Sequence, residues 1–516
     1  MKNIKYIYIA ILSVLVTSCS SFLDTMPDNR AEIDSSDKVR KLLVSAYPTN
    51  GYIMTNEVSS DNVDTSGPEN PYTSKFVEQL YNWEDVTESN NESPTRIWGS
   101  CYLSIASANQ ALASIEELGE EDLQGARSEA LLCRAYSHFV LVNMFAQHFS
   151  EANSSTDLGV YYMTAPETTL NPKYQRQSVL SNYKDIEKDI LEGISLINQT
   201  KFDVPKYHFN DKAAYAFATR FFLYKGDMDA VIKYASLALG SNPETQTRDN
   251  KLLATYPTDA ISKQFISPSL KANYLLMTAY SDLGLMFGPY YSNSKINHKA
   301  ILASTETTMT NAPWGQYSRD LYYLFPRQYS GSNLDKVLSP KLPYLFEYTD
   351  AVAQTGYRRT VYAAFTADEV LLSRAEAYVR KGNYDAAVSD LNVWLKANVK
   401  NYTPMTEATL LNWIKDMPYY TPINPTPRKK LNPEFTVQEG KQEQLLQIIL
   451  YARRIETIHT GLRWMDIKRY GIEVTRRVIE SNRVVALGST LTVRDKRLAI
   501  QLPAEVIAAG LEANPR

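Results

Sequence analysis

A short motif occurs twice in the chain, and it restricts the possible folds more than any other feature of the sequence. Residues 225–232 (Lys-Gly-Asp-Met-Asp-Ala-Val-Ile) match residues 381–388 (Lys-Gly-Asn-Tyr-Asp-Ala-Ala-Val). On both sides of each Gly, alanine and aromatic residues recur every three or four positions, which is the spacing of one helical face. Because Gly readily adopts the left-handed conformation that ends a helix, each copy predicts two helices joined by a tight turn.

Helix pairs of this kind are expected to stack, because one pair cannot bury its own apolar face. The arrangement resembles tetratricopeptide repeats; the alternative is that two helical hairpins match by chance over a short stretch. Similar periodicity predicts further helices at 98–118, 126–147 and 179–198. The sequence therefore predicts a mainly α fold, with a scaffold of helical hairpins over about 98–240 and 366–398.

Helical periodicity fades between the two copies, over residues 241–365. Glycines, prolines and aromatic residues alternate there, and a loop-rich segment of this length inside a helical frame is usually functional. Residues 400–440 are also rich in proline and irregular. A C-terminal helical block is predicted over 442–516, with helices to residue 482 and an extended tail after it.

The start of the chain has the features of an export signal. Lys2 and Lys5 precede an apolar stretch over 6–16, and small residues lead directly to Cys19. This stretch is shorter than the roughly 20 residues that cross a bilayer. Small residues directly before a Cys are typical of a lipobox, in which the thiol is acylated, with palmitate among the chains. We therefore predict a signal peptide over 1–18, lipidation at Cys19 and a tether over 19–37; the alternative is an ordinary cleaved signal with a nearby Cys.

The charge of the chain excludes one large class of partner. It has 57 acidic against 54 basic residues, whereas nucleic-acid binding requires a basic surface. After Cys19 only Cys101 and Cys133 remain, which excludes a small disulfide-rich fold and leaves open whether the two pair.

Motifs for catalysis or metal binding are not found. The five histidines do not have the spacing of a zinc site, and there is no nucleophile elbow or phosphate loop. Residues 61–64 contain two Asp, but they lack the Gly and distal Glu of a calcium loop and are expected to form a turn. We therefore predict a binding protein with no metal or cofactor. A pair of glycosidase carboxylates stays possible, since such groups meet only in space.

Aromatic residues in the irregular segments are the candidates for ligand binding. The chain has 36 Tyr, 16 Phe and 6 Trp. Aromatic faces stack on sugar rings and neighbouring amides bind hydroxyl groups; the alternative is local core packing, which we expect for about half of the candidates. The candidates are Tyr81, Trp83, Tyr290, Tyr291, Trp314 and Tyr317.

Near the C-terminus the chain becomes similar to a known family. The stretches 453–456 (Arg-Arg-Ile-Glu) and 461–471 (Gly-Leu-Arg-Trp-Met-Asp-Ile-Lys-Arg-Tyr-Gly), the ending 499–507 with Asn514-Pro515, and residues 21–24 after Cys19 occur in a characteristic order. This set resembles the SusD/RagB-like lipoproteins. The resemblance covers nearly the whole chain after the leader and implies a structural family motif. Its residues are Arg454, Glu456, Arg463, Trp464, Asp466 and Arg469.

Within this motif Arg463, Asp466 and Arg469 are three residues apart. One carboxylate on a helical face can then pair with two guanidinium groups. The functional interpretation is a clamp for an acidic ligand, but a balanced Arg–Asp ladder is more often a packing network. We favour the structural interpretation.

The resemblance implies a single SusD-like domain over 38–516, in a cell-surface lipoprotein of the outer membrane that is held by its lipid anchor alone. Such a protein would bind a nutrient oligosaccharide and pass it to a SusC-like TonB-dependent transporter barrel. Capture of an oligopeptide by the same fold is the alternative, and a surface glycoside hydrolase is a third possibility.

Overall fold

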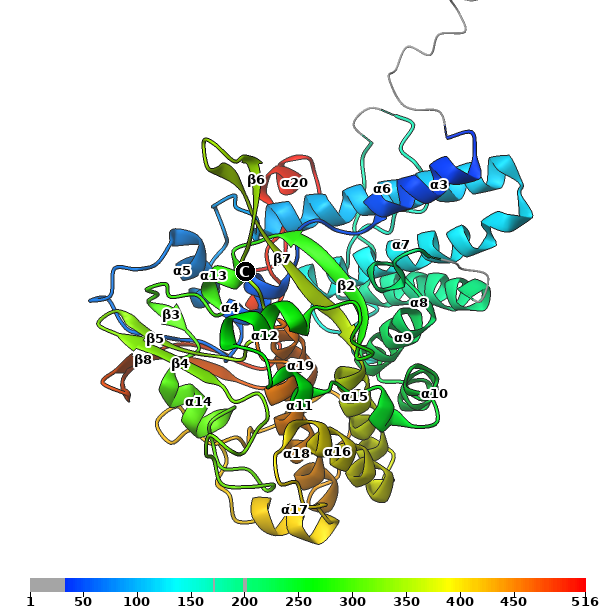
Figure 1. Cartoon of the computed structure of the whole chain (residues 1–516). Coiled ribbons are helices and arrows are strands. Elements are labelled where there is room, and N and C mark those ends of the chain that lie inside the picture. The colour runs from blue at the N-terminus through cyan, green and yellow to red at the C-terminus, as the bar shows by residue number, and fades with distance from the viewer. Residues whose placement is uncertain (1–32, 170–171, 198–201) are drawn as a thin grey trace, which may run out of the picture.

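The structure is a computed structural model that describes residues 33–169, 172–197 and 202–516. The predicted signal peptide, Cys19 and most of the predicted tether lie outside these residues. Helices form a curved layer on one side of the molecule, and small sheets with short helices lie on the other (Figure 1). Within the described ranges, no helix has both the length and the apolar character to cross a bilayer. The prediction of a mainly α fold built from helical hairpins is confirmed.

The helical layer follows the order of the chain. Each helix packs on the next from α6 to α10, α10 packs on α15, and α15 packs on both α16 and α18. The helices expected at 98–118, 126–147 and 179–198 are present, with boundaries shifted by a few residues. The bounds are α6 (Pro94–Leu118), α7 (Gln124–Phe145), α8 (Val179–Leu196), α9 (Asp211–Lys225), α10 (Met228–Leu239), α15 (Ala367–Arg380), α16 (Tyr384–Asn398) and α18 (Lys441–Glu456).

The repeated motif forms two helical hairpins, α9–α10 and α15–α16. Gly226 ends α9 at φ 91°, and Gly382 follows α15 at φ 77°, so both glycines have the left-handed conformation that the sequence predicts. Asp227 caps the next helix in the first copy, as Asn383 does in the second. Because α10 packs on α15, the two copies lie side by side although they are far apart in sequence.

The described residues form three small sheets. Their strand orders are β3-β1-β8-β9, β2-β7-β6 and β4-β5. The strands are β1 (Asp64–Thr65), β2 (Asn273–Tyr280), β3 (Ile296–Asn297), β4 (Arg327–Gly331), β5 (Leu334–Leu338), β6 (Leu345–Asp350), β7 (Thr355–Thr366), β8 (Val474–Glu480) and β9 (Arg483–Leu491). The remaining α-helices are α3 (Ser36–Leu43), α4 (Ile53–Ser59), α5 (Lys75–Asn82), α11 (Asn250–Leu253), α12 (Thr258–Phe265), α13 (Leu283–Met286), α14 (Ala300–Glu306), α17 (Glu407–Ile414), α19 (Leu462–Tyr470) and α20 (Ala504–Ala508).

The predicted C-terminal helical block is only partly helical. Helices α18 and α19 are present, but the expectation of helix up to residue 482 is wrong beyond Tyr470. Gly471 has φ 54° and ends α19, and the β-branched residues after it favour a strand. Ser481 and Asn482 have φ 48° and 60°, which suits the tight turn of the β8–β9 hairpin.

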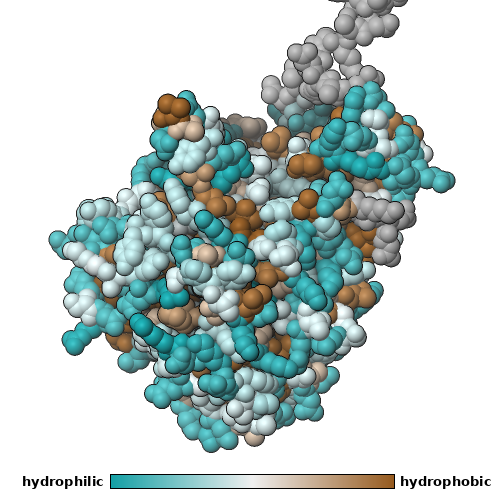
Figure 2. Space-filling model, viewed as in Figure 1, coloured by the Kyte–Doolittle hydropathy of each residue, from teal (hydrophilic) through white to brown (hydrophobic). Residues whose placement is uncertain are grey.

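The segment predicted as a loop-rich insert contains short helices and several strands. Its most prominent feature is the β6–β7 hairpin, which projects from the body at the top of Figure 1. Apolar side chains gather at the tip of this hairpin and in the hollow beside it (Figure 2). Val352 in the hairpin turn is 96% exposed.

Candidate functional site

Aromatic side chains from three segments meet near the base of the β6–β7 hairpin. The ring of Tyr290 lies 4.8 Å from that of Tyr344, and Tyr291 stacks on Tyr329 at 4.5 Å between ring centroids. Tyr290 is 42% exposed and Tyr291 is 69% exposed, so both rings face solvent. We call the following six residues the aromatic surface: Tyr290, Tyr291, Tyr329, Tyr344, Phe346 and Tyr348.

The hairpin contributes its aromatic residues through strand alternation. Residues 344, 346 and 348 are all aromatic, and alternate residues of a strand share one face. Phe346 packs on Tyr348 at 4.8 Å and lies opposite Arg358 of β7. This period-two pattern was present in the sequence, and it could have added these residues to the candidates.

Two glycines bring the loop that carries Tyr290 against the hairpin. A Cβ atom on Gly284 would lie 2.5 Å from the Cα atom of Tyr344, and one on Gly288 would lie 2.6 Å from the carbonyl oxygen of Leu342. No other residue type permits so close an approach of two backbones. The loop therefore packs directly on residues 342–344, which places Tyr290 against Tyr344.

Charged groups at the edge of this surface are paired. Arg358 donates a hydrogen bond to Asp282 at 2.7 Å, and Arg359 forms an ion pair with Glu347. The guanidinium of Arg359 also lies 4.2 Å from the ring centroid of Tyr280. The surface therefore offers exposed ring faces beside fixed polar groups, which is an arrangement that can bind a polar ligand with flat apolar faces.

Two of the predicted binding residues are buried in the core. Tyr81 is 4% exposed and Trp83 is 6% exposed, so the prediction that they stack on a ligand is wrong and the alternative of core packing applies to both. Both rings pack on the guanidinium of Arg476, at 4.1 and 4.0 Å. The indole nitrogen of Trp83 donates to the carbonyl oxygen of Ser59 at 2.8 Å. These aromatics hold a buried arginine, a long-range contact that the local sequence does not show.

Trp314 is also buried, at 7% exposure, and the prediction that it stacks on a ligand is wrong here as well. It stacks on Tyr451 of α18 at 5.5 Å and donates to the hydroxyl of Tyr322 at 3.0 Å. Tyr317 is half-buried and packs against the core. Of the six candidates, the structure brings only Tyr290 and Tyr291 together at the aromatic surface.

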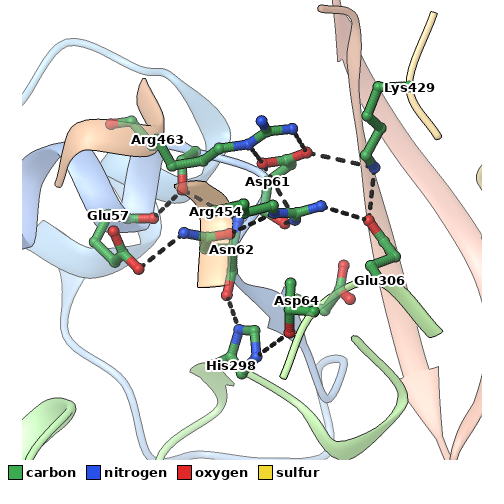
Figure 3. A network of polar contacts seen from close by, with 12 residues as sticks. Glu57, Asp61, Asn62, Asp64, His298, Glu306, Lys429, Arg454 and Arg463 are labelled. Carbon is green, nitrogen blue, oxygen red and sulfur yellow. Dashed lines mark hydrogen bonds and ion pairs between the residues drawn. The ribbon is translucent and has the colours of Figure 1, made fainter. Parts of the chain in front are cut away.

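Two of the family-motif residues, Arg454 and Arg463, lie in a network of buried charges (Figure 3). Arg463 forms two hydrogen bonds with Asp61, at 2.7 and 2.8 Å, and Arg454 lies 3.3 Å from the same carboxylate. Arg454 also pairs with Glu306 at 3.2 Å, and Lys429 does so at 2.6 Å. Burial opposes ionisation of Glu306, but the surrounding cations outweigh it and hold its pKa at about 2.

Asp466 bridges two arginines, as its spacing predicts, but the partners differ in part. It pairs with Arg469 at 2.8 Å and with Arg453 at 3.0 Å, whereas Arg463 pairs with Asp61. Trp464 is fully buried in the same region. The carboxylate of Glu456 accepts a hydrogen bond from the indole of Trp394 at 2.9 Å. The network joins α18 and α19 to the segment after α4, which is a packing role.

The structure also places the two cysteines after the leader and the acidic residues of the 61–64 turn. Cys101 and Cys133 are free and buried, so they do not form a disulfide. In the described parts of the chain, no group of three or more His, Cys, Asp or Glu side chains could hold a metal ion. The Asp61–Asp64 turn supplies carboxylates to arginines rather than forming an open oxygen cluster.

Comparison with known proteins agrees with this fold. Residues 21–223 match the family model SusD-like_3, described as starch-binding and associating with the outer membrane. A SusD superfamily protein from Bacteroides thetaiotaomicron VPI-5482 is 17% identical, with a TM-score of 0.61 over 93% of this chain and 99% of that one. A comparison with curated proteins found no match.

Two further solved structures show the same likeness. A SusD superfamily protein from Bacteroides fragilis is 18% identical, with a TM-score of 0.63 over 92% of this chain and 98% of that one. A putative sugar binding protein from Bacteroides vulgatus ATCC 8482 is 16% identical, with a TM-score of 0.63 over 94% and 99%. The SusD-like fold that the resemblance implies is thus confirmed over nearly the whole chain, and the N-terminal part also matches a family model of this type.

Proposed function

We propose that this protein is a cell-surface lipoprotein of the outer membrane that binds a nutrient oligosaccharide and passes it to a SusC-like TonB-dependent transporter. The observation that carries the proposal is the aromatic surface, which presents the stacked pair Tyr291–Tyr329 and the pair Tyr290–Tyr344 on a fold of the SusD superfamily. Rings exposed on one face suit the C–H faces of sugars. The matching family model is described as starch-binding and one of the similar structures as a sugar binding protein, which supports a carbohydrate ligand.

Binding rather than hydrolysis fits the carboxylates at this surface. Asp282 and Glu347 are two acidic groups of the segments that carry the rings, and each is paired with an arginine. A retaining or inverting glycosidase needs one carboxyl group that gives a proton and a second that acts as nucleophile or base. Two carboxylates held by guanidinium groups are poorly suited to that exchange of protons.

One observation favours the second candidate, an oligopeptide ligand. Strand β6 is at the edge of the sheet β2-β7-β6, next to the aromatic surface, so one side of its backbone is unpaired within that sheet. An extended peptide can add to such an edge through main-chain hydrogen bonds. The same surface would then supply pockets for alternate side chains of the peptide.

A binding panel tests the proposal and separates the two ligand classes. Purified protein is assayed by calorimetry against a set of oligosaccharides and against a protein digest. We expect binding to at least one oligosaccharide, weakened by Tyr291→Ala and unchanged by Tyr256→Ala, an exposed tyrosine outside the aromatic surface. Binding of peptides alone would support the second candidate, and oligosaccharide binding that Tyr291→Ala leaves intact would contradict the assignment of the surface.

The lipid anchor and the transporter are separate parts of the proposal. Cys19→Ala is expected to release the protein from the membrane fraction, because acyl chains on this thiol would anchor it in the bilayer. Cys101→Ser, which changes a buried thiol, serves as the control. Retention of the Cys19→Ala protein in washed membranes would contradict lipidation. Co-purification of a transporter barrel with the tagged wild-type protein tests the partner.

A further inference from the structure

Lys336 on β5 is buried beneath the aromatic surface, with 1% of its surface exposed. Its ammonium group donates hydrogen bonds to two main-chain carbonyl oxygens, that of Leu285 at 3.2 Å and that of Tyr290 at 3.0 Å. Among the described residues, no carboxylate forms an ion pair with it. One side chain thus holds both ends of the loop from residue 285 to residue 290.

The same ammonium group faces the ring beneath Tyr291. Lys336 pairs in register with Tyr329 across the β4–β5 hairpin, so the two side chains share one face. Its Nζ atom lies 5.8 Å from the centroid of the Tyr329 ring, and that ring stacks on Tyr291. Lys336 therefore interacts with two parts of the aromatic surface. One is the backbone of Tyr290, and the other is the Tyr329 ring that supports Tyr291.

Among the described residues, Lys336 is the group whose hydrogen bonds join this loop to a distant part of the chain. Within the described structure, the main-chain bonds of residues 285–291 are local, such as that from Tyr290 to the carbonyl oxygen of Gly288 at 2.8 Å. The close packing at Gly284 and Gly288 fixes the first part of the loop. Lys336 supplies the hydrogen bonds that reach the part carrying the exposed tyrosines.

Burial of this lysine is unfavourable for the fold by itself. Desolvation lowers the pKa of Lys336 to about 7, which means that the protein destabilises its charged form. An apolar side chain of similar length would avoid this cost but would leave two carbonyl groups without a partner. What the lysine provides, and an apolar side chain would not, is a pair of hydrogen bonds that fixes the position of the loop.

We propose that Lys336 is a positioning residue of the ligand-binding surface, which holds Tyr290 and Tyr291 in place above Tyr329 and the hairpin. This inference rests on the proposed function of the aromatic surface. The residue does not contact the ligand; it acts through the two carbonyl groups and the Tyr329 ring. Loss of its hydrogen bonds would loosen the loop while the helical layer stays intact.

Lys468 on α19 provides a matched control. It is also buried at 1% exposure, and it also donates to two carbonyl oxygens, those of Asn143 at 2.8 Å and Ala146 at 2.6 Å. Burial lowers its pKa to about 7, as for Lys336. The two lysines thus differ in which segment they hold.

The test compares Lys336→Met with Lys468→Met in the full chain, by amide hydrogen exchange and by affinity for the oligosaccharide or peptide that the panel identifies. We expect Lys336→Met to increase exchange of residues 285–291 by about tenfold or more and to weaken binding by a similar factor, whereas Lys468→Met changes neither. If Lys336→Met does not fold, Lys336→Gln, which keeps a shorter donor, replaces it.

The outcomes separate this inference from the proposed function. Unchanged exchange of residues 285–291 in the Lys336 variant would overturn the positioning role, whatever the panel shows. Faster exchange with unchanged affinity would overturn the link between this loop and binding, and with it the inference. Faster exchange with weaker binding, absent in the Lys468 variant, supports it.

Discussion

Two regions of the molecule are rich in aromatic and charged side chains, but they use them differently. In the core, the faces and polar edges of the rings are occupied by protein groups, as with Trp83 on Arg476 of β8 and Trp314 on Tyr451 of α18. At the aromatic surface, Tyr291 uses one face against Tyr329 and leaves 69% of its surface exposed. A ring in an irregular segment is thus a binding candidate only when the protein leaves one of its faces free.

The charges in the two regions differ in the same way. In the core, Glu306 pairs with Lys429, Arg454 and Arg477, each far from it in sequence. At the surface, Arg358 pairs with one carboxylate, that of Asp282, and this pair is partly exposed. Buried networks of this kind fix the position of chain segments, whereas an exposed pair contributes little to stability.

The largest expected effect is in the core network. Glu306→Ala removes the carboxylate that three cations share, and it should destabilise the fold by about 3–5 kcal/mol because those cations stay buried without it. Denaturant unfolding measures the change. Glu244→Ala is the control, since Glu244 forms an exposed pair with Lys396 that should contribute little to stability. If both variants lowered the free energy of unfolding equally, the buried network would not be more important for stability than an exposed ion pair.

The buried aromatic candidates should also behave as core residues. Trp314→Ala is expected to lower the free energy of unfolding by about 3–5 kcal/mol, because the cavity removes its contacts with Tyr451 and Trp394. Thermal and denaturant unfolding check this. A variant with wild-type stability would show that the ring is not packed as described.

Glu92 is a buried carboxyl group beside Asp282, and its effect on stability depends on pH. It is 2% exposed, and its carboxylate accepts a hydrogen bond from the backbone of Asp282 at 2.5 Å. Burial raises its pKa from 4.5 to about 7. The folded state then binds more protons than the unfolded state between these two pH values, so stability falls as the pH rises through that window.

Glu92→Gln removes this proton binding while it keeps an oxygen that can accept the bond. The variant should unfold like the wild type near pH 4.5 and should be more stable by about 3 kcal/mol at and above pH 7. Unfolding curves recorded across this range measure the difference. A constant difference at every pH would mean that Glu92 does not titrate in the folded protein within this window.

The smallest effect on stability is expected at the aromatic surface. Tyr291→Ala should change the free energy of unfolding by less than about 0.5 kcal/mol, because most of the ring is exposed. Its effect should appear in ligand affinity, with a loss of about 0.5–1.5 kcal/mol for one stacking face. Calorimetric titration beside an unfolding curve gives both values. A large loss of stability would place Tyr291 with the core aromatics instead.

Much of the scaffold could be predicted from the sequence because its signals are local. Helical periodicity located α6, α7 and α8, and the repeated Lys-Gly motif located the turns at Gly226 and Gly382. When apolar residues recur every three or four positions, the α-helix is the structure that places them all on one face, where they can be buried together. The β8–β9 hairpin was missed because helical periodicity was extended past Gly471, where β-branched residues and the turn at Ser481 favour strands.

By itself, the sequence determined the helical repeats, the resemblance to a family and the presence of aromatic residues in irregular segments. Only the tertiary structure decided which of those aromatics are free: Arg476 comes from β8 to cover Tyr81 and Trp83, and Tyr451 comes from α18 to cover Trp314. The physical reason is that helix formation depends on neighbours a few residues away, whereas exposure depends on contacts between segments far apart in the chain. Tyr290 and Tyr291 differ from the buried rings in those long-range contacts, which local composition does not show.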